Sequence, residues 1–415
     1  MRRSALVVAA VLAASALTAS VAVAQTTPTT PATTAPGTTT PPTTTLPATA
    51  LTRSTISVGG VVDPAFAGAE VGAQARIARA NARGGVGGRR IVYVGTALDA
   101  KGAISGVVPI SAVVPAASPT LDTATLAAAK VPFFGPGDTA AWTGNASGFG
   151  FAGAQVPKAS RTTSPAWGIT LKALLGGAKG RSIAVAVAPT TADAGASARA
   201  SLEAVGFTTA AALTVAVGAD PAATATALAQ AGPDGVVLLT DALTTGALAS
   251  ALAARSFTGT VATTSDFYRP ENPAIASGIT VLVPYAPPEQ TTAANRTLLA
   301  DVERYAPGTK VTAAVIAGYW GADEFVAALT MAGKGATSAK FAKTLRTFTY
   351  EVKDTVGPTA FPAAHANAAP CGALVQSDGT LYLPAVTYRC GKPVKVKPSG
   401  PGTTGTTGTS TTTTK

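Results

Sequence analysis

The stretch Gly68–Val94, GAEVGAQARIARANARGGVGGRRIVYV, decides how this chain is interpreted. It holds four glycines within five residues: Gly84, Gly85, Gly87 and Gly88. Such a cluster is typical either of a phosphate-binding loop or of a connector between a helix and a strand. A phosphate loop follows a strand and opens a helix whose N-terminus faces the anion. Here a helical pattern precedes the glycines and the apolar run Arg90–Val94 follows them, so the stretch predicts a connector.

The helix before these glycines carries three arginines on one face. Arg76, Arg79 and Arg83 are spaced i, i+3 and i+7, which places them along one side of an α-helix. We expect this stripe to face solvent. Gly84 and Gly85 follow the last turn, where a left-handed C-cap favours glycine. The glycine pair therefore marks the end of the helix, and Gly87 and Gly88 turn the chain into the next strand.

The rest of the core alternates short β-branched runs with longer alanine-rich segments. The expected strands are Thr55–Val62, Arg90–Val94, Val107–Val114, Val131–Gly135, Ser182–Ala188, Gly235–Thr240, Thr260–Thr264 and Ile279–Val283. The expected helices are 68–83, 121–129, 165–178, 193–205, 221–231, 243–255, 289–305 and 311–332. Most of the strand runs are apolar on both faces, as parallel strands covered by helices are. The alternation predicts an α/β fold with parallel sheets.

Two of the helix starts have a clear sequence signal. Ser164-Pro165 and Asp220-Pro221 each supply an N-cap residue followed by a proline, which is favoured at the first helical position. We therefore expect Ser164 and Asp220 to cap the helices that follow them.

The N-terminus has the pattern of a secretory signal peptide. Residues 1–24 begin with Arg2 and Arg3, continue with an apolar run and end in small residues, which predicts cleavage before Gln25. The run 5–24 is also long enough for an uncleaved anchor, which is the alternative. No cysteine follows the run, so a lipid anchor is not indicated. We expect an exported protein, secreted or held in the periplasm or cell envelope.

Threonine-rich tracts flank the core. Residues 25–52 are dominated by Thr and Pro, and residues 396–415 by Thr and Gly. Neither composition can bury a core, so we expect a disordered linker and a disordered tail. The tracts are either sites of O-linked sugars or an unmodified stalk and tail. The globular part then runs from Arg53 to about Lys395, which suits two domains or one large α/β domain.

The charge of the chain argues against a nucleic-acid partner. The formal net charge is +11, but residues 51–388 keep only +4, because Arg2, Arg3 and five cations from Arg389 to Lys415 supply the rest. A nucleic-acid interface concentrates cations over a groove and interleaves them with aromatic side chains. Here the arginines are scattered, and aromatic residues make up 6% of the chain.

The two cysteines are consistent with export. Cys371 and Cys390 flank a segment in which Asp378-Gly379 stands between two apolar runs, a strong hairpin signal. A disulfide between the arms of the hairpin is therefore expected, with a stabilisation of about 3 kcal/mol. Free thiols or a metal pair are the alternatives, but a metal site needs more ligands and His365 is the only histidine.

The sequence contains no recognisable catalytic arrangement. Nucleophilic catalysis by Ser or Cys needs a histidine beside the nucleophile, and we expect His365 to be a surface or disulfide-proximal loop residue. Neither Lys179 nor Lys334 lies in a phosphate-loop motif, and no cluster of Cys and His suits zinc. We therefore expect no cofactor, no metal and no enzymatic activity, with an aspartate-based hydrolase as a remaining alternative.

Aspartates follow several of the expected strands. In α/β folds the loops after the carboxyl ends of strands are the usual ligand-binding loops. An aspartate in such a loop is either a ligand contact or a helix N-cap or turn residue. The aspartates concerned are Asp63, Asp138, Asp193, Asp241 and Asp266.

Three segments together resemble the type I periplasmic solute-binding proteins, the Leu/Ile/Val-binding branch of the ABC transporter receptors. Gly68–Val94 is similar to the family pattern GaxxGaxxAxxxxNaxGGvnGrxIxxv, which follows the first strand. FGPGDTAAW, Phe134–Trp142, resembles the PGxTxP-like ligand loop, and AAVIAGYWGADEFVAALTMAG, Ala313–Gly333, resembles the late helix. Their order and spacing match over about residues 55–390.

This resemblance implies two flavodoxin-like (Rossmann-like) lobes with parallel sheets, joined by a three-segment hinge. The first lobe would comprise residues 53–165 and 284–345, and the second 166–283 and 346–395. A small solute such as an amino acid would bind in the cleft, and the protein would pass it to an ABC transporter permease. We expect a monomer.

The resemblance also implies the ligand contacts. Ser118 occupies the position of a hydroxyl that takes a ligand carboxylate, and Gly137 and Thr139 match the PGxT loop. Asp266 lies near the second-lobe acid that pairs with an amino group, with Asp241 as the next candidate. The full expected set is Phe66, Ser118, Gly137, Asp138, Thr139, Asp241 and Asp266.

Some positions depart from the family pattern. Ala194 stands where an aromatic residue usually faces the ligand, and Asp138 and Trp142 bring an acid and a bulky ring to the carboxylate-binding loop. These changes favour a larger, cationic or non-amino-acid solute. The alternative function is a ligand-sensing or cell-envelope interaction protein on the same fold without a transport role, an alternative strengthened by the Thr-rich stalk and the missing lipid cysteine.

Overall fold

The computed structural model describes residues 51–156 and 162–396. The predicted signal peptide, nearly all of the predicted linker and the predicted tail lie outside the described residues. Among the described residues, none of the helices combines the length and the apolar character needed to cross a bilayer.

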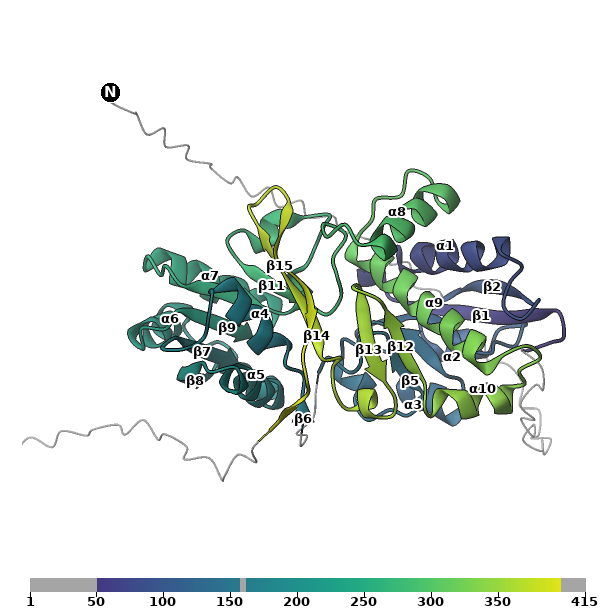
Figure 1. Cartoon of the computed structure of the whole chain (residues 1–415), viewed down its shortest axis with the longest axis horizontal. Helices are drawn as coiled ribbons and strands as arrows, with labels where there is room; N and C mark the ends of the chain where they lie inside the picture. The colour runs from purple at the N-terminus through teal and green to yellow at the C-terminus, as the bar shows by residue number, and fades with distance from the viewer. Residues whose placement is uncertain (1–50, 157–161, 397–415) are drawn as a thin grey trace, which may run out of the picture. The chain divides into compact units, whose positions relative to one another are not determined.

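The N-terminal part of the core forms a five-stranded parallel sheet with the order β2-β1-β3-β4-β5. Figure 1 labels β1, β2 and β5 of this sheet. Its strands are β1 Thr55–Val62, β2 Arg90–Ala97, β3 Val113–Ala117, β4 Phe133–Gly135 and β5 Gly148–Gly150. All five residues of β3 are buried, as expected for a central parallel strand covered on both faces.

The second sheet has seven strands in the order β15-β14-β11-β10-β9-β7-β8. Strands β7 to β11 are parallel, and β14 and β15 extend the sheet as an antiparallel hairpin. The strands are β7 Ser182–Val187, β8 Thr208–Thr214, β9 Gly235–Leu239, β10 Thr260–Thr263, β11 Thr280–Val283, β14 Cys371–Ser377 and β15 Tyr382–Cys390. Two small antiparallel pairs remain: β6 Thr162–Thr163 with β16 Val394–Lys395, and β12 Thr349–Val352 with β13 Val356–Ala360.

Each helix expected from the sequence is present, and in the expected order. The helices are α1 Ala69–Ala82, α2 Ala100–Ile104, α3 Thr123–Ala128, α4 Ala166–Leu174, α5 Ala192–Ala204, α6 Pro221–Gln230, α7 Ala242–Ala254, α8 Ala293–Tyr305, α9 Ala313–Ala332 and α10 Ser338–Leu345. Short 3-10 turns occur at Pro64–Phe66, Ala140–Trp142, Pro189–Thr191, Ser265–Phe267, Pro273–Ala276 and Ala363–His365. Helices α2 and α10 were not predicted.

One predicted strand is largely wrong. The apolar run Val107–Val114 was expected to form a single strand, but β3 begins only at Val113. Val107 and Val108 are exposed. The run combines an exposed loop with the start of a buried strand, a distinction that apolar character alone does not make.

The glycines after α1 act as a connector, as predicted. Gly84 and Gly85 have φ of +92° and +75°. Their backbone N–H groups donate to the carbonyls of Asn81 and Ala80 at 3.0 and 2.9 Å, which is the bond pattern of a Schellman motif. Val86 and Arg89 then exchange backbone hydrogen bonds, and the chain enters β2.

The two predicted N-caps have different outcomes. Asp220 caps α6 as expected, since its carboxylate accepts hydrogen bonds from the N–H groups of Ala222 and Ala223 and Pro221 is the first helical residue. In α4 the helix begins one residue later than predicted, so Pro165 is itself the N-cap. The Ser164 hydroxyl still accepts a hydrogen bond from the N–H of Ala166, at 3.3 Å.

Helices α1 and α9 lie in direct backbone contact. A Cβ atom on Gly72 would lie 1.9 Å from the carbonyl oxygen of Val315, and a Cβ on Gly318 would lie 1.8 Å from that of Ala69. Real side-chain atoms do not approach this closely, so both positions require glycine at this helix spacing. These two glycines therefore allow the backbones of α1 and α9 to approach to van der Waals contact.

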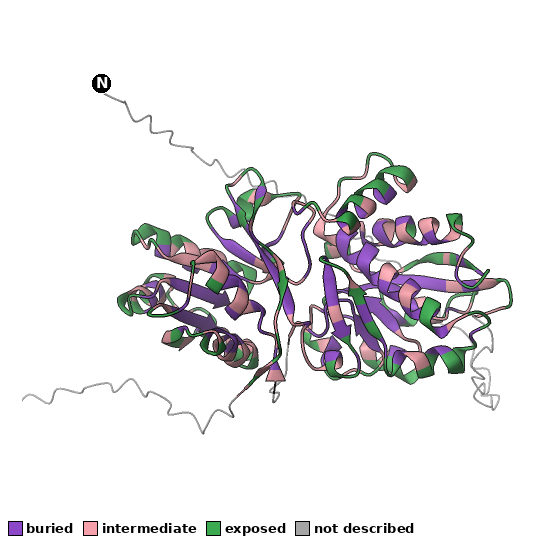
Figure 2. Ribbon diagram, in the orientation of Figure 1, coloured by how far each residue is buried: buried purple, intermediate pink, exposed green. Residues whose placement is uncertain are grey.

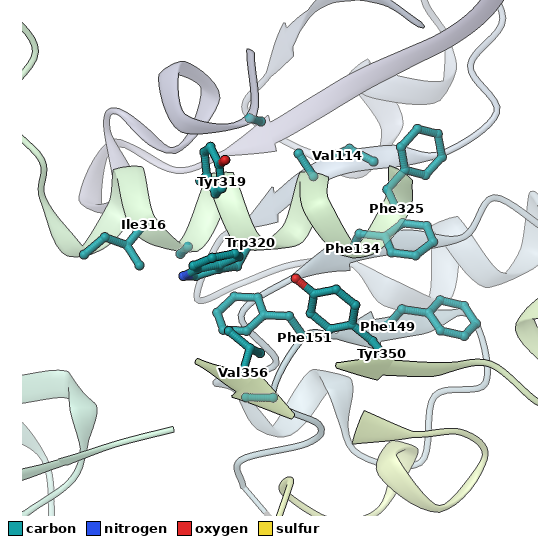
Figure 3. Close-up of a cluster of buried hydrophobic side chains, with 14 of the residues drawn as sticks. Val114, Phe134, Phe149, Phe151, Ile316, Tyr319, Trp320, Phe325, Tyr350 and Val356 are labelled. Carbon is teal, nitrogen blue, oxygen red and sulfur yellow. The ribbon is translucent and has the colours of Figure 1, made fainter. Parts of the chain in front are cut away.

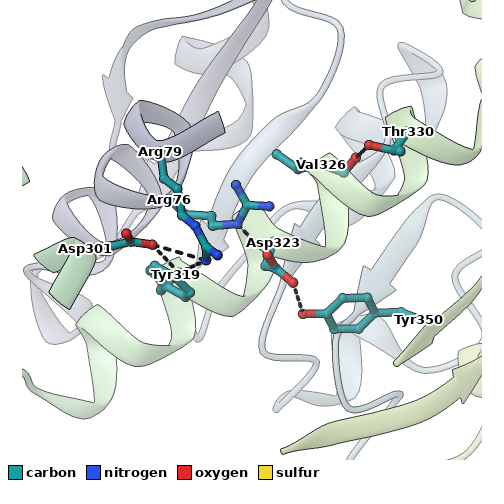
Figure 4. A network of polar contacts seen from close by, with 8 residues as sticks. All are labelled: Arg76, Arg79, Asp301, Tyr319, Asp323, Val326, Thr330 and Tyr350. Carbon is teal, nitrogen blue, oxygen red and sulfur yellow. Dashed lines mark hydrogen bonds and ion pairs between the residues drawn. The ribbon is translucent and has the colours of Figure 1, made fainter. Parts of the chain in front are cut away.

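The predicted solvent-facing arginine stripe on α1 is wrong for two of its three members. Arg76 pairs with Asp323 of α9 and Arg79 lies 3.4 Å from Asp301 of α8, and the side chains of Arg76 and Arg79 are only 13% and 23% exposed (Figure 4). Arg83 is exposed as predicted. The helical spacing identified one face of α1 correctly, but acids on two distant helices cover most of that face.

Two tyrosines complete this ionic network. Tyr350 of β12 donates a hydrogen bond of 2.9 Å to Asp323, and Tyr319 of α9 donates one of 2.6 Å to Asp301 (Figure 4). Arg79 also donates to the Tyr319 hydroxyl at 3.1 Å. Because each carboxylate has both a cationic and a hydroxyl partner, the buried charges are compensated.

The core of this part of the molecule is aromatic. Phe134 of β4 stacks on Phe149 of β5 and meets Phe325 of α9 edge to face, with ring centroids 5.2 and 5.3 Å apart (Figure 3). Trp320 lies on the same helix and is buried. Figure 2 shows α9 as a mostly buried helix, which fits its largely apolar sequence, with Asp323 and Glu324 as the acidic exceptions.

The chain passes between the two sheets three times. It does so after β5, after β11 and between β13 and β14, as in a two-lobe fold with a three-segment hinge. The exact lobe boundaries remain a proposal. The hydrogen bond from Tyr350 to Asp323 favours grouping residues 349–360 with the first lobe, which would move the last boundary from 346 to about 370.

The predicted hairpin and disulfide are both present. Cys371 at the start of β14 is bonded to Cys390 at the end of β15. Asp378 begins the turn and its carboxylate accepts hydrogen bonds from the N–H groups of Thr380 and Leu381. Gly379 has a φ of +93°, a conformation for which glycine is the favoured residue.

Replacing Gly72 by alanine should destabilise the protein by about 3 kcal/mol, because the new methyl group would displace the α9 backbone. The matched control is Gly246→Ala in α7, where a Cβ meets nothing within 4 Å. That change should stabilise by about 0.5–1 kcal/mol, through helix propensity alone. Urea denaturation measures both, and equal effects of the two substitutions would contradict the close contact.

Reduction of the Cys371–Cys390 bond should lower the free energy of unfolding by about 3 kcal/mol, since it frees the loop that the bond closes in the unfolded chain. Thermal unfolding with and without dithiothreitol tests this. The double variant Cys371→Ala/Cys390→Ala is the control, and its stability should not respond to the reductant.

Candidate functional site

The candidate site is a cavity of about 180 Å³ formed mostly by loops that follow strands. The first sheet contributes Asp138, after β4, and the second contributes Thr240 after β9 and Asp266 after β10. In parallel α/β sheets these are the loops that bind ligands. The cavity is also lined by Gln155, Val156, Thr163, Ser164, Ala166, Trp167, Thr191, Ala194, Ser197, Ala198, Leu239, Thr264, Ser265, Leu282, Pro284, Ala368, Ala369 and Cys371.

Two carboxylates dominate the electrostatics of this cavity. The pKa of Asp138 is raised to about 7. Burial is the main cause, the charge of Asp266 adds to it, and Arg269 has the opposite effect. The pKa of Asp266 is also raised, chiefly because its carboxylate is partly removed from water, while Arg269 and a hydrogen bond with Thr264 lower it. Burial therefore disfavours the ionisation of both acids, and the charge of Asp266 adds to this effect at Asp138.

Gly137 and Thr139 flank Asp138 but do not line the cavity. Gly137 has a φ of +73°, and a Cβ there would lie 2.3 Å from the carbonyl oxygen of Gly153. Gln155 donates a hydrogen bond of 2.8 Å to the Pro136 carbonyl, and this bond fixes the same loop. The Thr139 hydroxyl is buried and has no hydrogen-bond partner among the described residues.

The remaining predicted contacts also lie outside the lining of the cavity. Ser118 is buried after β3, where its hydroxyl accepts a hydrogen bond from the N–H of Thr120 at 3.3 Å. Phe66 is half-buried and packs against a small apolar cluster that includes Ala69. Asp241 is exposed and caps α7 by accepting from the N–H of Thr244 at 2.9 Å. Of the seven expected residues, the structure brings Asp138 and Asp266 together in one cavity.

Several lining residues were not predicted. Trp167 lies in the first turn of α4 and supplies an aromatic ring to the cavity. Ala194, where the family usually has an aromatic residue, lines the same cavity. Ser164-Pro165 marks the helix start in the sequence, but no local signal shows that Trp167 lines a cavity, because most of its neighbours there come from distant segments.

The only histidine of the chain is not where it was expected. His365 is half-buried between the rings of Phe149 and Phe361, and its Nδ1 lies 3.0 Å from the carbonyl oxygen of Gly148. Burial lowers the pKa of the His365 side chain. The surface placement is therefore wrong, because the loop folds back onto β5, whereas the alternative of a loop residue near the disulfide stays a prediction. Within residues 51–156 and 162–396 no three His, Cys, Asp or Glu side chains gather in a way that suits a metal ion.

The two sheets form a two-lobe α/β fold with a cavity at the ends of their strands. The chain belongs to the periplasmic binding protein family, whose model matches residues 54–380. No curated protein sequence matches it. The resemblance found in the sequence is thereby confirmed, and the family is one of substrate-binding proteins rather than enzymes.

Solved structures of ABC transporter binding proteins share the fold. The fatty acid transporter substrate-binding protein of Thermomonospora curvata is 16% identical, with 83% of this chain and 95% of that chain covered and a TM-score of 0.58. A solute-binding protein of R. palustris in complex with 4-hydroxybenzoate is 18% identical, with 82% and 98% covered and a TM-score of 0.59. A putative branched-chain amino acid transporter protein of Rhodospirillum rubrum is 15% identical, with 80% and 100% covered and a TM-score of 0.61.

Replacing Asp138 by asparagine should change how stability depends on pH. Because the folded pKa of about 7 lies above the ordinary value of 3.8, the contribution of the protonated carboxyl is complete below about pH 4 and is lost as the pH rises through 7. Asp138→Asn should therefore become more stable relative to wild type from pH 5 to pH 8, by on the order of 2 kcal/mol after solvent screening.

Thermal or urea unfolding at several pH values measures this difference. Asp122→Asn is the control, because Asp122 is an exposed N-cap of α3 whose pKa is lowered by its hydrogen bonds with Thr125. Its difference from wild type should stay constant from pH 5 to pH 8. A constant difference for Asp138→Asn as well would show that Asp138 is an ordinary ionised surface acid.

Proposed function

We propose that this protein is an extracytoplasmic solute-binding protein that captures a small polar solute and delivers it to the permease of an ABC transporter. The observation that supports this most directly is the cavity that combines Asp138, from the first sheet, with Thr240 and Asp266, from the second. A solute held by loops of both sheets makes some of its contacts only when the lobes are closed. It therefore favours the closed form by its differential affinity.

The two aspartates favour a solute that carries a cationic group. An ammonium group next to Asp138 and Asp266 would compensate two carboxylates whose pKa values are both raised, chiefly by burial. An anionic group in the same place would be repelled by the ionised carboxylates and would raise their pKa further. Amino acids and related amines carry such an ammonium group. A fatty acid or a hydroxybenzoate, the ligands named for two structural neighbours, has only the anionic group.

The rest of the cavity is suited to the uncharged part of such a solute. Trp167, Leu239 and Leu282 offer apolar surface, and Thr191 and Thr240 offer hydroxyl groups. Sites of this kind bind mainly by burying apolar surface and orient the ligand through a few polar groups. Ala194 leaves room where a ring would otherwise stand, which fits a side chain larger than that of a small aliphatic amino acid.

We propose that the solute leaves this protein chemically unchanged. The residues that line the cavity include no histidine, and its one cysteine, Cys371, is held in the disulfide. A pair of carboxylates is able to perform acid–base catalysis, so a measurement of turnover distinguishes a binding protein from an aspartate-based hydrolase. We infer export from the basic and apolar pattern of residues 1–24, and the monomeric state stays a prediction.

Native mass spectrometry of the purified protein, followed by thermal-shift measurements, tests this function. Basic and zwitterionic amino acids and amines should raise the unfolding temperature, and 4-hydroxybenzoate and fatty acids should not. A ligand at about a hundred times its dissociation constant adds roughly 2.7 kcal/mol of stability. Asp138→Asn and Asp266→Asn should each weaken the best ligand at least tenfold, because each removes one charge that pairs with it.

Asp241→Asn is the matched control for these two variants. Asp241 follows β9 but caps α7 and does not line the cavity. Asparagine is an equally good N-cap residue, so the replacement should cost no more than about 0.5 kcal/mol of stability and leave the affinity unchanged. Thr139→Ala tests the neighbouring loop, and we expect weaker binding. Tight binding of an aromatic or aliphatic acid that survives both aspartate substitutions would contradict the proposed solute class, and hydrolysis of the bound compound would contradict the transport role.

A further inference from the structure

A second cavity, of about 680 Å³, lies where the turn after α1 meets the N-terminus of α10. It shares no lining residue with the solute cavity. Its polar lining includes Arg53, Arg89, Lys334, Thr337 and Ser338. None of its lining residues is an aspartate or a glutamate, so three cationic residues line this space without an acid.

Arg89 is the central observation. The residue is only 3% exposed, and its Nη1 donates a hydrogen bond of 2.9 Å to the carbonyl oxygen of Ala336. Its Nε and Nη2 are buried and have no hydrogen-bond partner among the described residues. A buried guanidinium without an anionic partner is energetically costly, and nothing in the described part of the chain forms an ion pair with it.

The turn that carries Arg89 is held in place by close packing. Gly87 has a φ of +60°, and a Cβ there would lie 3.1 Å from the Cα of Lys334. The backbone hydrogen bonds between Val86 and Arg89 close the turn. The glycine cluster thus brings Arg89 and Lys334 to the same cavity, a role that the order of strand and helix around the glycines did not reveal.

Helix α10 adds a second favourable feature. Thr337 caps the helix by accepting from the N–H of Lys340 at 3.3 Å. The other N–H groups of the first turn have no partner within a helix, and together with the helix dipole they attract negative charge. Ser338 adds a hydroxyl at the same end of α10.

We propose that this second cavity is a binding site for a phosphate group. A guanidinium with two adjacent unpartnered donors suits the bidentate binding of an oxyanion. Three cations and a helix N-terminus suit the charge of a phosphate, close to two, better than the single charge of a carboxylate. The phosphate is either inorganic phosphate or the phosphate of a larger molecule, such as a polyol phosphate or a lipid headgroup.

Calorimetric titration of the secreted protein with inorganic phosphate at constant ionic strength tests the proposal. We expect saturable binding with one phosphate per chain, weaker binding of sulfate, and the weakest binding of acetate. The double variant Arg53→Gln/Lys334→Gln should weaken phosphate binding at least tenfold. Both side chains are exposed, so this variant should fold normally.

Two further variants make the test specific. Lys179→Gln removes one exposed charge outside the cavity and should leave phosphate binding within twofold of wild type. Arg89→Lys keeps the charge but removes the forked donors, and should weaken binding about as strongly as the double variant. Loss of binding in Lys179→Gln would show general attraction to a basic protein and would overturn the proposal.

Two additional probes distinguish the sources of the phosphate. Glycerol 3-phosphate that binds more tightly than inorganic phosphate would indicate a larger phosphorylated molecule, and equal affinities would indicate inorganic phosphate. Vesicles that contain phosphatidic acid extend the series to a lipid headgroup. Binding to vesicles without saturable binding of either soluble phosphate would overturn the proposal, because it would show a basic surface rather than a built site. None of these outcomes depends on the solute cavity.

Discussion

The structure depends on the backbone contact between α1 and α9. Gly72 and Gly318 allow it, since any side chain at either position would overlap a carbonyl of the other helix. The same contact continues into β4, because a Cβ on Gly321 would lie only 3.1 Å from the Cα of Gly135. The loop that follows β4 carries Asp138, so the placement of this carboxylate follows from glycines on two helices that are far apart in the sequence.

The ionic network and the solute cavity use charge in opposite ways. Asp301 and Asp323 each have an arginine and a tyrosine hydroxyl as partners, so their charges are compensated within the protein and fix the helices. Asp138 and Asp266 line one cavity, and Arg269 is the cation that opposes the raised pKa of both. Asp301 and Asp323 are thus satisfied before any ligand arrives, whereas the proposed solute-binding acids Asp138 and Asp266 would leave part of their compensation to the ligand.

Much of the fold could be predicted from the sequence, and the candidate site only in part. The alternation of apolar runs and alanine-rich segments predicts the parallel sheets, and turn residues such as Gly84 and Asp378 predict the connectors. These predictions succeed because their signals lie within short stretches of the chain. The burial of Arg76 was missed, since helical spacing defines a face but not what covers it. Asp138 and Asp266 were found from their positions after strands, while Asp241 has the same position and caps a helix. Trp167 and Arg89 were missed because their neighbours come from distant segments.

The late position of α9 in the chain has a consequence for biogenesis. Helix α1 ends at Ala82 and its partner begins only at Ala313, so the apolar face of α1 has no cover while the intervening residues emerge. The second sheet likewise receives its last two strands from residues 371–390. Such long sequence separations make folding slow and leave early segments open to aggregation. Neither lobe can close its core on a nascent chain, so we expect the polypeptide to cross the membrane unfolded and to acquire its structure only after translocation is nearly complete.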